Sequence, residues 1–263
     1  MPAVYAHASF GKKVFKLLSG ECRETVKRYK RYYMLGLQGP DILFFYRPFY
    51  PNSVVKTGLK IHQEEACGFI GHLAGMVKRY GKDSPECAYV LGFICHYMLD
   101  TACHPFVDEE IGRTGIDHIS LETELEISLM AADGIDPYTY DLRRVLPYDE
   151  DMPLHISRVY PGISRLQVRE AVVSMRAAKH FLTCKEQNRW RIKLMRADKH
   201  FAHKLVYPHM ICPGKGYDTE YSDKELKRLM DESVVKTSDI IMEFYRNQTV
   251  GSVFNMNFYG RKL

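Results

Sequence analysis

The sequence has no long apolar run and little of the residue alternation that marks β-strands. No stretch of about 18 residues, the minimum for a helix that crosses a bilayer, is both apolar and free of charge. Apolar residues instead recur at helical spacing through most of the chain. We therefore expect an all-α protein without a transmembrane segment.

The patterns of an exported protein are also missing. The seven cysteines are odd in number and none stands in a CxxC pair, which argues against a four-cysteine zinc site and favours reduced thiols. The N-terminal residues MPAVYAHASFGKKVFKLL carry Lys12, Lys13 and Lys16 where a secretory signal would have its apolar run. We expect a cytoplasmic location.

The composition is that of one folded unit. A chain of 263 residues with 46% hydrophobic residues can bury a full core, and we expect a single domain over 1–263. Its formal charge of +5 gives no argument for nucleic acid. Ser84 and Asp117 should cap helices, and Pro105 should end one at His104. Helices are predicted over 10–18, 22–37, 58–80, 84–104, 118–132, 164–183, 185–206 and 222–247, with mostly irregular chain over 38–53 and 134–163.

Two histidine–carboxylate pairs stand four residues apart on these helices. His96 precedes Asp100 and His118 precedes Glu122, so each pair shares a helix face with Cβ atoms about 5–6 Å apart. His104 lies two turns beyond His96 at an offset of about 80°, which suits two adjacent metals better than one. Either pair alone could be an ordinary hydrogen bond. Two pairs on apolar helices, where unpaired charge is costly, indicate a metal site. Zinc is favoured, and manganese or iron would accept the same donors.

These residues form part of a longer ordered series. Upstream stand a histidine, an aspartate and another histidine, each of which alone has an ordinary explanation as a surface or turn residue. The whole series resembles the bacterial zinc-dependent phospholipase C family, whose helical fold is shared with the zinc-dependent single-strand-specific nucleases. The family pattern is His, Asp, His, HxxxD, His and HxxxE, and it corresponds here to His7, Asp41, His62, His96 with Asp100, His104, and His118 with Glu122.

The resemblance implies a polynuclear zinc site between helices. It assigns one zinc to His62, His96 and Asp100, a second to His104, His118 and Glu122, and a third to Asp100 with His7. Asp41 would touch the metals and act as the general base for a bridging water. Two to three zinc ions would lower the pKa of that water and neutralise the charge of a phosphodiester.

The chain departs from the family at its start. Secreted members begin with a tryptophan whose amine and carbonyl bind the third zinc, whereas the only tryptophan here is Trp190. Loss of Met1 would leave the amine of Pro2 as a substitute. Occupancy of the third site stays open.

The resemblance leaves the substrate open. We expect a lipid-like phosphoester rather than nucleic acid, and a transient contact of the protein with a membrane surface. Residues 151–210 hold twelve Lys or Arg against four Asp or Glu. They could form a basic wall beside the metal site that attracts an anionic substrate, but we favour an ordinary solvated helix surface. An aromatic cluster beside Asp41 could receive an acyl chain, a choline-like head group or a base, although core packing is the commoner role. Its members are Phe44, Phe45, Tyr46, Phe49 and Tyr50.

Two alternatives to a phospholipase C-like phosphodiesterase remain. One is a non-catalytic metal-containing binding protein, and the other is a nuclease or nucleotide phosphoesterase of the same fold. Two further classes are disfavoured by absent motifs. No ExxH pair occurs, as a di-iron oxidase would need, and no HD dipeptide occurs, as a His-Asp phosphohydrolase would need.

Overall fold

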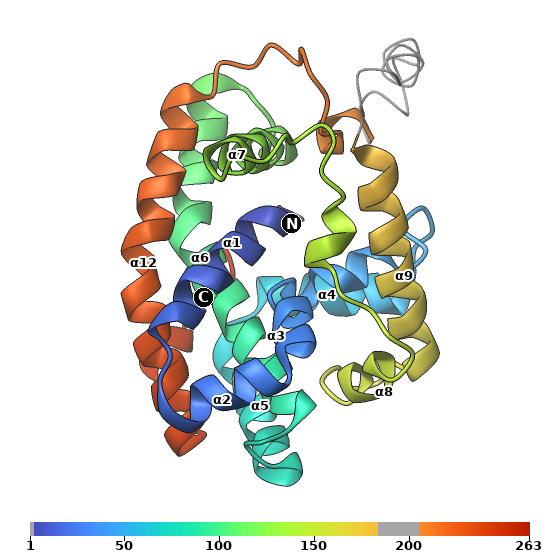
Figure 1. Ribbon diagram of the computed structural model, residues 1–263, viewed down its shortest axis with the longest axis vertical. Helices are drawn as coiled ribbons and strands as arrows, with labels where there is room; N and C mark the ends of the chain where they lie inside the picture. The colour runs from blue at the N-terminus through green and yellow to red at the C-terminus, as the bar shows by residue number, and fades with distance from the viewer. Residues whose placement is uncertain (1–2, 184–205) are drawn as a thin grey trace.

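The computed structural model describes residues 3–183 and 206–263, and within them the protein is built of helices (Figure 1). This part of the chain has no β-strand, only an isolated bridge between Thr183 and Ile211. The all-α prediction is confirmed. None of the helices in these ranges has the length and apolar character needed to cross a membrane.

The first helices follow the predicted break at Ser19-Gly20. α1 (Val4–Leu17) ends there, and Gly20 has a positive φ of 56° that favours glycine. The single helix predicted over 22–37 is two helices, α2 (Gly20–Arg28) and α3 (Lys30–Gly36). The chain bends between them at Tyr29, whose ψ of 36° is not helical.

The structure differs more from the prediction over residues 39–80. Residues 39–45 form a 3₁₀ helix, η1 (Gly39–Phe45), and the helix predicted over 58–80 is α4 (Ser53–Gln63) followed by α5 (Ala66–Tyr80). Two extended residues, Glu64 and Glu65, separate them, with ψ values of 157° and 131°. The first backbone N–H of α5, on Ala66, donates to the carbonyl of Met256. A partner far along the chain therefore stabilises a break that local periodicity does not show.

The central helix α6 (Pro85–Thr114) continues through Pro105, so the predicted end at His104 is wrong. Ser84 caps its start as expected, accepting a hydrogen bond from the Cys87 N–H at 3.1 Å. A proline inside a helix costs about 3 kcal/mol because it removes a hydrogen bond and crowds the preceding turn. Burial against α1, α3, α5 and α12 on several sides of α6 offsets that cost.

The remaining helices agree well with the predicted ranges. Asp117 caps α7 (His118–Ala132), and Ser164 begins α9 (Arg165–Leu182) with a capping box completed by Gln167. The segment 134–163, predicted as mostly irregular, contains two short helices. The helix predicted over 185–206 lies almost wholly outside the described residues. The other elements are η2 (Leu142–Val145), α8 (Met152–Ser157), η4 (Tyr207–His209), α12 (Glu220–Asn247) and η5 (Ser252–Phe254).

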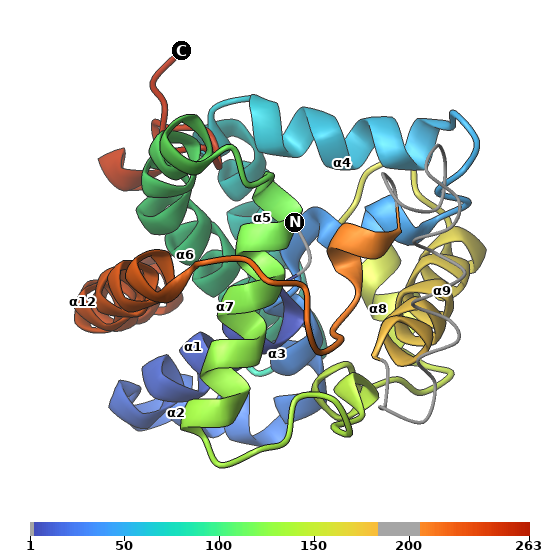
Figure 2. The same ribbon diagram turned by 90° about the horizontal axis from the view of Figure 1, so that it is seen from above.

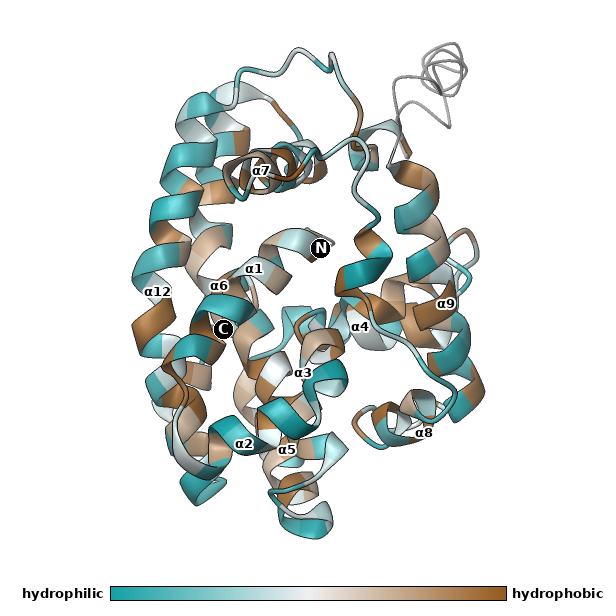
Figure 3. Cartoon of the chain, in the orientation of Figure 1, coloured by the Kyte–Doolittle hydropathy of each residue, from teal (hydrophilic) through white to brown (hydrophobic). Residues whose placement is uncertain are grey.

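The helices pack around α6, and the start of α1 lies in the interior beside α6 and α7 (Figures 1 and 2). Hydrophilic residues cover the outer sides of α2 and α12, as Figure 3 shows. α3 packs closely against α6, and two glycines there allow the backbones to touch. A methyl group on Gly36 would collide with the Tyr89 carbonyl, and one on Gly92 with the Tyr33 carbonyl.

This contact gives a stability prediction. Gly92→Ala should lower the free energy of unfolding by roughly 1–3 kcal/mol, because the methyl group meets backbone that cannot rotate away. Gly112→Ala on the same helix is the matched control, since nothing lies within 4 Å of its added carbon. It should raise stability by about 0.5–1 kcal/mol through helix propensity. Urea denaturation measures both, and equal effects would show that the glycine contact does not set the helix spacing.

Candidate metal centre

All eight predicted site residues meet inside the helical array. They come from five elements that are separate in the sequence between residues 4 and 132: α1, η1, α4, α6 and α7. Their nitrogen and oxygen atoms form three groups, and within each group the ligand atoms lie within 4.8 Å of one another. The groups are His7 with His96 and Asp100, Asp41 with His62 and His96, and His104 with His118 and Glu122.

The first group joins α1 to α6. His7 Nε2 lies 3.4 Å from one carboxylate oxygen of Asp100, and His96 Nε2 lies 3.2 Å from the other. The rings of His7 and His96 stack with centroids 4.2 Å apart. All three side chains are buried, so their polar atoms face one another rather than solvent.

The second group depends on the turn that carries Asp41. Asp41 Oδ1 lies 3.0 Å from His62 Nε2, and both side chains are buried. Two residues earlier, Gly39 has a φ of 50°, and any side chain there would collide with the ring of His96. The hydroxyl of Tyr160 donates to the Gly39 carbonyl at 2.7 Å. A glycine and a buried tyrosine therefore hold Asp41 against the histidines.

The third group spans α6 and α7. His118 Nε2 lies 2.8 Å from Glu122 Oε1, and His104 Nε2 lies 3.8 Å from the same oxygen. This partition differs from the one that the resemblance implied, because His96 belongs to two groups and stands with Asp41 and His62 as well as with Asp100. The third group matches the implied set.

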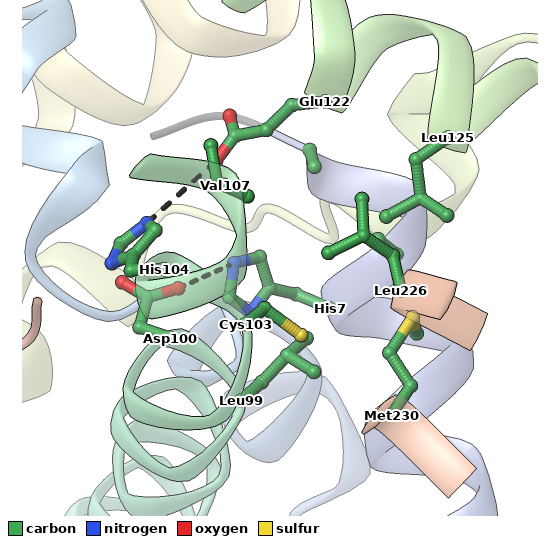
Figure 4. A pocket seen from close by; sticks show the side chains of 12 residues that line it. His7, Leu99, Asp100, Cys103, His104, Val107, Glu122, Leu125, Leu226 and Met230 are labelled. Carbon is green, nitrogen blue, oxygen red and sulfur yellow. Dashed lines mark ion pairs between the residues drawn. The ribbon is translucent and has the colours of Figure 1, made fainter. Parts of the chain in front are cut away.

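One cavity adjoins the first and third groups (Figure 4). His7, Asp100, His104 and Glu122 line it on one side, and apolar residues of α12 such as Met230 line it on the other. An apolar wall excludes water, and charge interactions are stronger in such surroundings. The ligands that line the cavity therefore face a largely apolar wall.

Backbone carbonyls orient three of the histidines. The Nδ1 atoms of His62, His96 and His104 lie within hydrogen-bond distance of carbonyl oxygens on Gly58, Leu37 and Phe258, at 2.8, 3.2 and 2.7 Å. A carbonyl can only accept, so each Nδ1 carries a proton and Nε2 is the ring atom left to face a metal. Histidines that bind metals in proteins are oriented in this way.

The donor set fits a bound cation. Nε2 of His62 and His96, Oδ2 of Asp100 and Oε2 of Glu122 are buried without a hydrogen-bond partner. Leaving such a buried atom unsatisfied costs about 1–3 kcal/mol, and more for a charged group. A cation among them would remove that cost, and imidazole nitrogen combined with carboxylate oxygen is a donor set that zinc accepts.

Burial and neighbouring charges also set the protonation of the ligands in the metal-free protein. Burial lowers the pKa of His7 to about 3, helped by His96, so this ring is neutral. Burial works against a charged His104, yet Asp100 and Glu122 prevail and raise its pKa to about 9. In the metal-free protein this imidazole therefore carries a second proton, on Nε2, which a bound cation would displace. Burial would raise the pKa of Asp100, but His96 and His104 hold it well below its usual range. The carboxylate is therefore ionised, as a metal ligand requires.

Sequence reasoning missed one part of the site. The tail after α12, to which the sequence patterns assign no part of the site, places the fully buried ring of Phe258 4.8 Å from that of His62. The ring of Tyr259 stacks on His104 at 5.4 Å. The one available signal was the aromatic content of FNMNFYG, which is unusual for a solvated tail.

Comparison with known proteins agrees with this geometry. A family model for zinc-dependent phospholipase C matches residues 6–162, more than half of the chain. The chain belongs to the zinc-dependent phospholipase C family. Zinc-dependent phospholipases C are hydrolases that act on phosphodiester bonds, and the match contains all eight site residues. No curated protein and no solved structure matches the chain. α9, α12 and the C-terminal tail lie outside the matched phospholipase C region.

Metal removal should therefore destabilise the fold. We expect a zinc chelator to lower the melting temperature, because the cations that satisfy the buried donors are lost. At free zinc a hundredfold above its dissociation constant, each site should contribute about 2.7 kcal/mol. Thermal denaturation with chelator, and after adding back zinc or magnesium, measures this effect. Zinc should restore the melting temperature and magnesium should not. An unchanged melting temperature after complete zinc removal would contradict a metal-linked fold.

Proposed function

We propose that the protein is a zinc-dependent phosphodiesterase that hydrolyses phospholipid-like phosphoesters through attack by an activated water. The observation that carries this proposal is the convergence of imidazole and carboxylate side chains into three groups, two of which contribute residues to one cavity. Family membership supplies the reaction class, and the groups supply positions for two to three zinc ions.

In this proposal the three groups hold the cations. Asp41, His62 and His96 form one set, His104, His118 and Glu122 form another, and His7 with Asp100 forms a third. Bound zinc would neutralise the phosphate oxygens, lower the pKa of a water and stabilise the leaving alkoxide.

Asp41 is the proposed general base. Burial alone would raise the pKa of its carboxyl, but nearby groups of positive charge, among them the imidazoles of His62 and His96, hold it below its usual range. The carboxylate is therefore ionised and can accept a proton at Oδ1 or Oδ2. The rigid turn at Gly39 keeps it within the buried centre, where a base must be positioned before it can act.

A lipid-like substrate is supported by the chain that follows Asp41. The ring of Phe44 lies 5.2 Å from that of His62, and Tyr46 packs in the core. Phe49 and Tyr50 are 66% and 73% exposed. Exposed aromatic side chains are typical of surfaces that touch the membrane interface. The aromatic cluster is therefore divided between the core and a surface that could meet lipid.

The arginines that could attract nucleic acid are engaged in other contacts. Arg165 donates to the Glu150 carbonyl, Arg169 contacts the Glu150 carboxylate, and Arg176 donates to the Leu146 carbonyl. These contacts support the ordinary-surface interpretation for the part of the basic segment that the structure describes. A polyanion would need a track of available cations, so lipid-like phosphoesters stay ahead of single-stranded nucleic acid.

Hydrolysis assays test the proposal directly. Purified protein of measured zinc content should cleave bis-p-nitrophenyl phosphate and phosphatidylcholine, and should cleave single-stranded DNA more slowly. A chelator should abolish the activity and added zinc should restore it. A zinc-loaded protein that cleaves none of these substrates would favour the binding-protein alternative, and faster cleavage of DNA would favour the nuclease.

A second test concerns Asp41. Asp41→Asn should retain most of the zinc, because the amide oxygen remains, and should lower kcat by about 10²–10⁴ because the general base is lost. Asp239→Asn, on the exposed side of α12, is the control and should leave kcat unchanged. Steady-state kinetics and metal analysis of both variants measure the effect. Normal turnover by Asp41→Asn would assign the base to another group.

A further inference from the structure

The C-terminal segment 255–261 folds back from the end of α12 to the metal centre. It follows η5 and lies beside α6 and the adjoining ends of α4 and α5, where Figure 2 shows it in red. The segment begins more than ninety residues after the matched family region, which ends at residue 162. The family pattern therefore assigns nothing to it.

Phe258 contacts two of the ligand-bearing helices through its backbone. Its carbonyl oxygen accepts a hydrogen bond from His104 Nδ1 on α6 at 2.7 Å, and its N–H donates to the carbonyl of His62 on α4 at 3.2 Å. Its ring, fully buried, lies 5.8 Å from that of His96. One residue outside the family pattern thus contacts three of the proposed zinc ligands.

Tyr259 adds a second contact to the same histidine. Its ring lies nearly parallel to that of His104, with centroids 5.4 Å apart and an interplanar angle of 30°. The Phe258 carbonyl and the Tyr259 ring together restrict the rotation of the imidazole. His104 Nε2 then lies 3.8 Å from Glu122 Oε1, within the third group.

Asn257 holds this part of the tail in shape. Its side-chain oxygen accepts from the N–H groups of Tyr259 and Arg261, both at 3.0 Å, and its side-chain nitrogen donates to the Gln63 carbonyl at 3.3 Å. Its own N–H donates to the Arg261 carbonyl at 2.9 Å. The tail is therefore a closed turn fastened to the end of α4.

Gly260 fits the turn against the proline of α6. Its φ of 71° favours glycine, and an added methyl carbon would lie 2.9 Å from Pro105 Cγ and 3.0 Å from the Thr101 carbonyl oxygen. Pro105 cannot donate a hydrogen bond to that carbonyl. The point where α6 lacks a helical hydrogen bond is thus the point where the tail packs closely.

We propose that the C-terminal segment 255–261 is a positioning element of the metal centre, with the Phe258 carbonyl fixing the His104 tautomer that presents Nε2 to zinc. This inference rests on the proposed function, because it concerns the third group of the same centre. Outer partners that orient metal-binding histidines typically change metal affinity by about 10- to 100-fold. A chain segment beyond the family pattern therefore determines how tightly one zinc is held.

Two full-length variants test the positioning role. Gly260→Ala should displace the turn from Pro105, and Asn257→Ala should remove its internal hydrogen bonds. Both should weaken the binding of one zinc by about 10- to 100-fold. The matched controls lie outside the segment: Gly251→Ala, with nothing within 4 Å of the added carbon, and Asn247→Ala at an exposed position. Zinc content, and competition with a chromophoric chelator, measure the affinity, with circular dichroism as the check on folding.

A spectroscopic measurement separates orientation from general stability. In zinc-loaded protein labelled with ¹⁵N-histidine, the His104 Nδ1 proton should exchange slowly with solvent in wild type and rapidly in Gly260→Ala. If Gly260→Ala does not fold, Tyr259→Ala provides the test, because it removes only a half-buried ring. It should still lower the zinc affinity and speed the exchange of the His104 Nδ1 proton with solvent.

Wild-type affinity together with wild-type exchange in the folded variants would overturn the positioning role. A wild-type protein that binds no zinc would instead refute the metal centre itself, and with it the proposed function.

Discussion

The burial of ionisable side chains on α6 is the constraint on which the structure depends. His96, Asp100 and His104 project from a helix that is packed on several sides, and each is at most 4% exposed. Burying charge without a partner is costly, so some of the elements that pack against this part of α6 must present complementary groups. α1 supplies His7, and α7 supplies Glu122. The need to pair the buried ionisable side chains of α6 therefore links the packing of α1 and α7 to the positions of the proposed ligands.

Support for the ligands comes largely from the backbone. The carbonyls of Gly58, Leu37 and Phe258 each orient one histidine, and those carbonyls lie in α4, at the end of α3 and in the C-terminal tail. The close contact of α3 with α6 through Gly92 brings the Leu37 carbonyl to His96, so a packing detail has a chemical consequence. Backbone acceptors carry no side-chain signature. They are set by how the helices pack and not by which residue stands at the position.

This explains how far the sequence could predict the structure. Helix caps at Ser84 and Asp117 are local, and both were predicted correctly. The continuation of α6 through Pro105 and the break before Ala66 depend on distant partners, so local rules failed at both. The spacing of two histidine–carboxylate pairs together with the family resemblance predicted eight site residues, and the structure brings their side chains into three groups. That they bind metal stays a prediction. The shared position of His96 and the role of Phe258 follow from tertiary contacts that one sequence does not show.

The region matched by the family model and the chain after it contribute differently to the site. Every proposed ligand lies within the family match, whereas α12 lines the cavity and the C-terminal tail orients His104 from outside it. Ligand chemistry tolerates little change in donor type or distance. A cavity wall needs only to be apolar and well packed, and a backbone carbonyl can belong to any residue. The chain after residue 162 can therefore vary in sequence without changing the metal centre, provided that α12 and the C-terminal tail still pack beside α6.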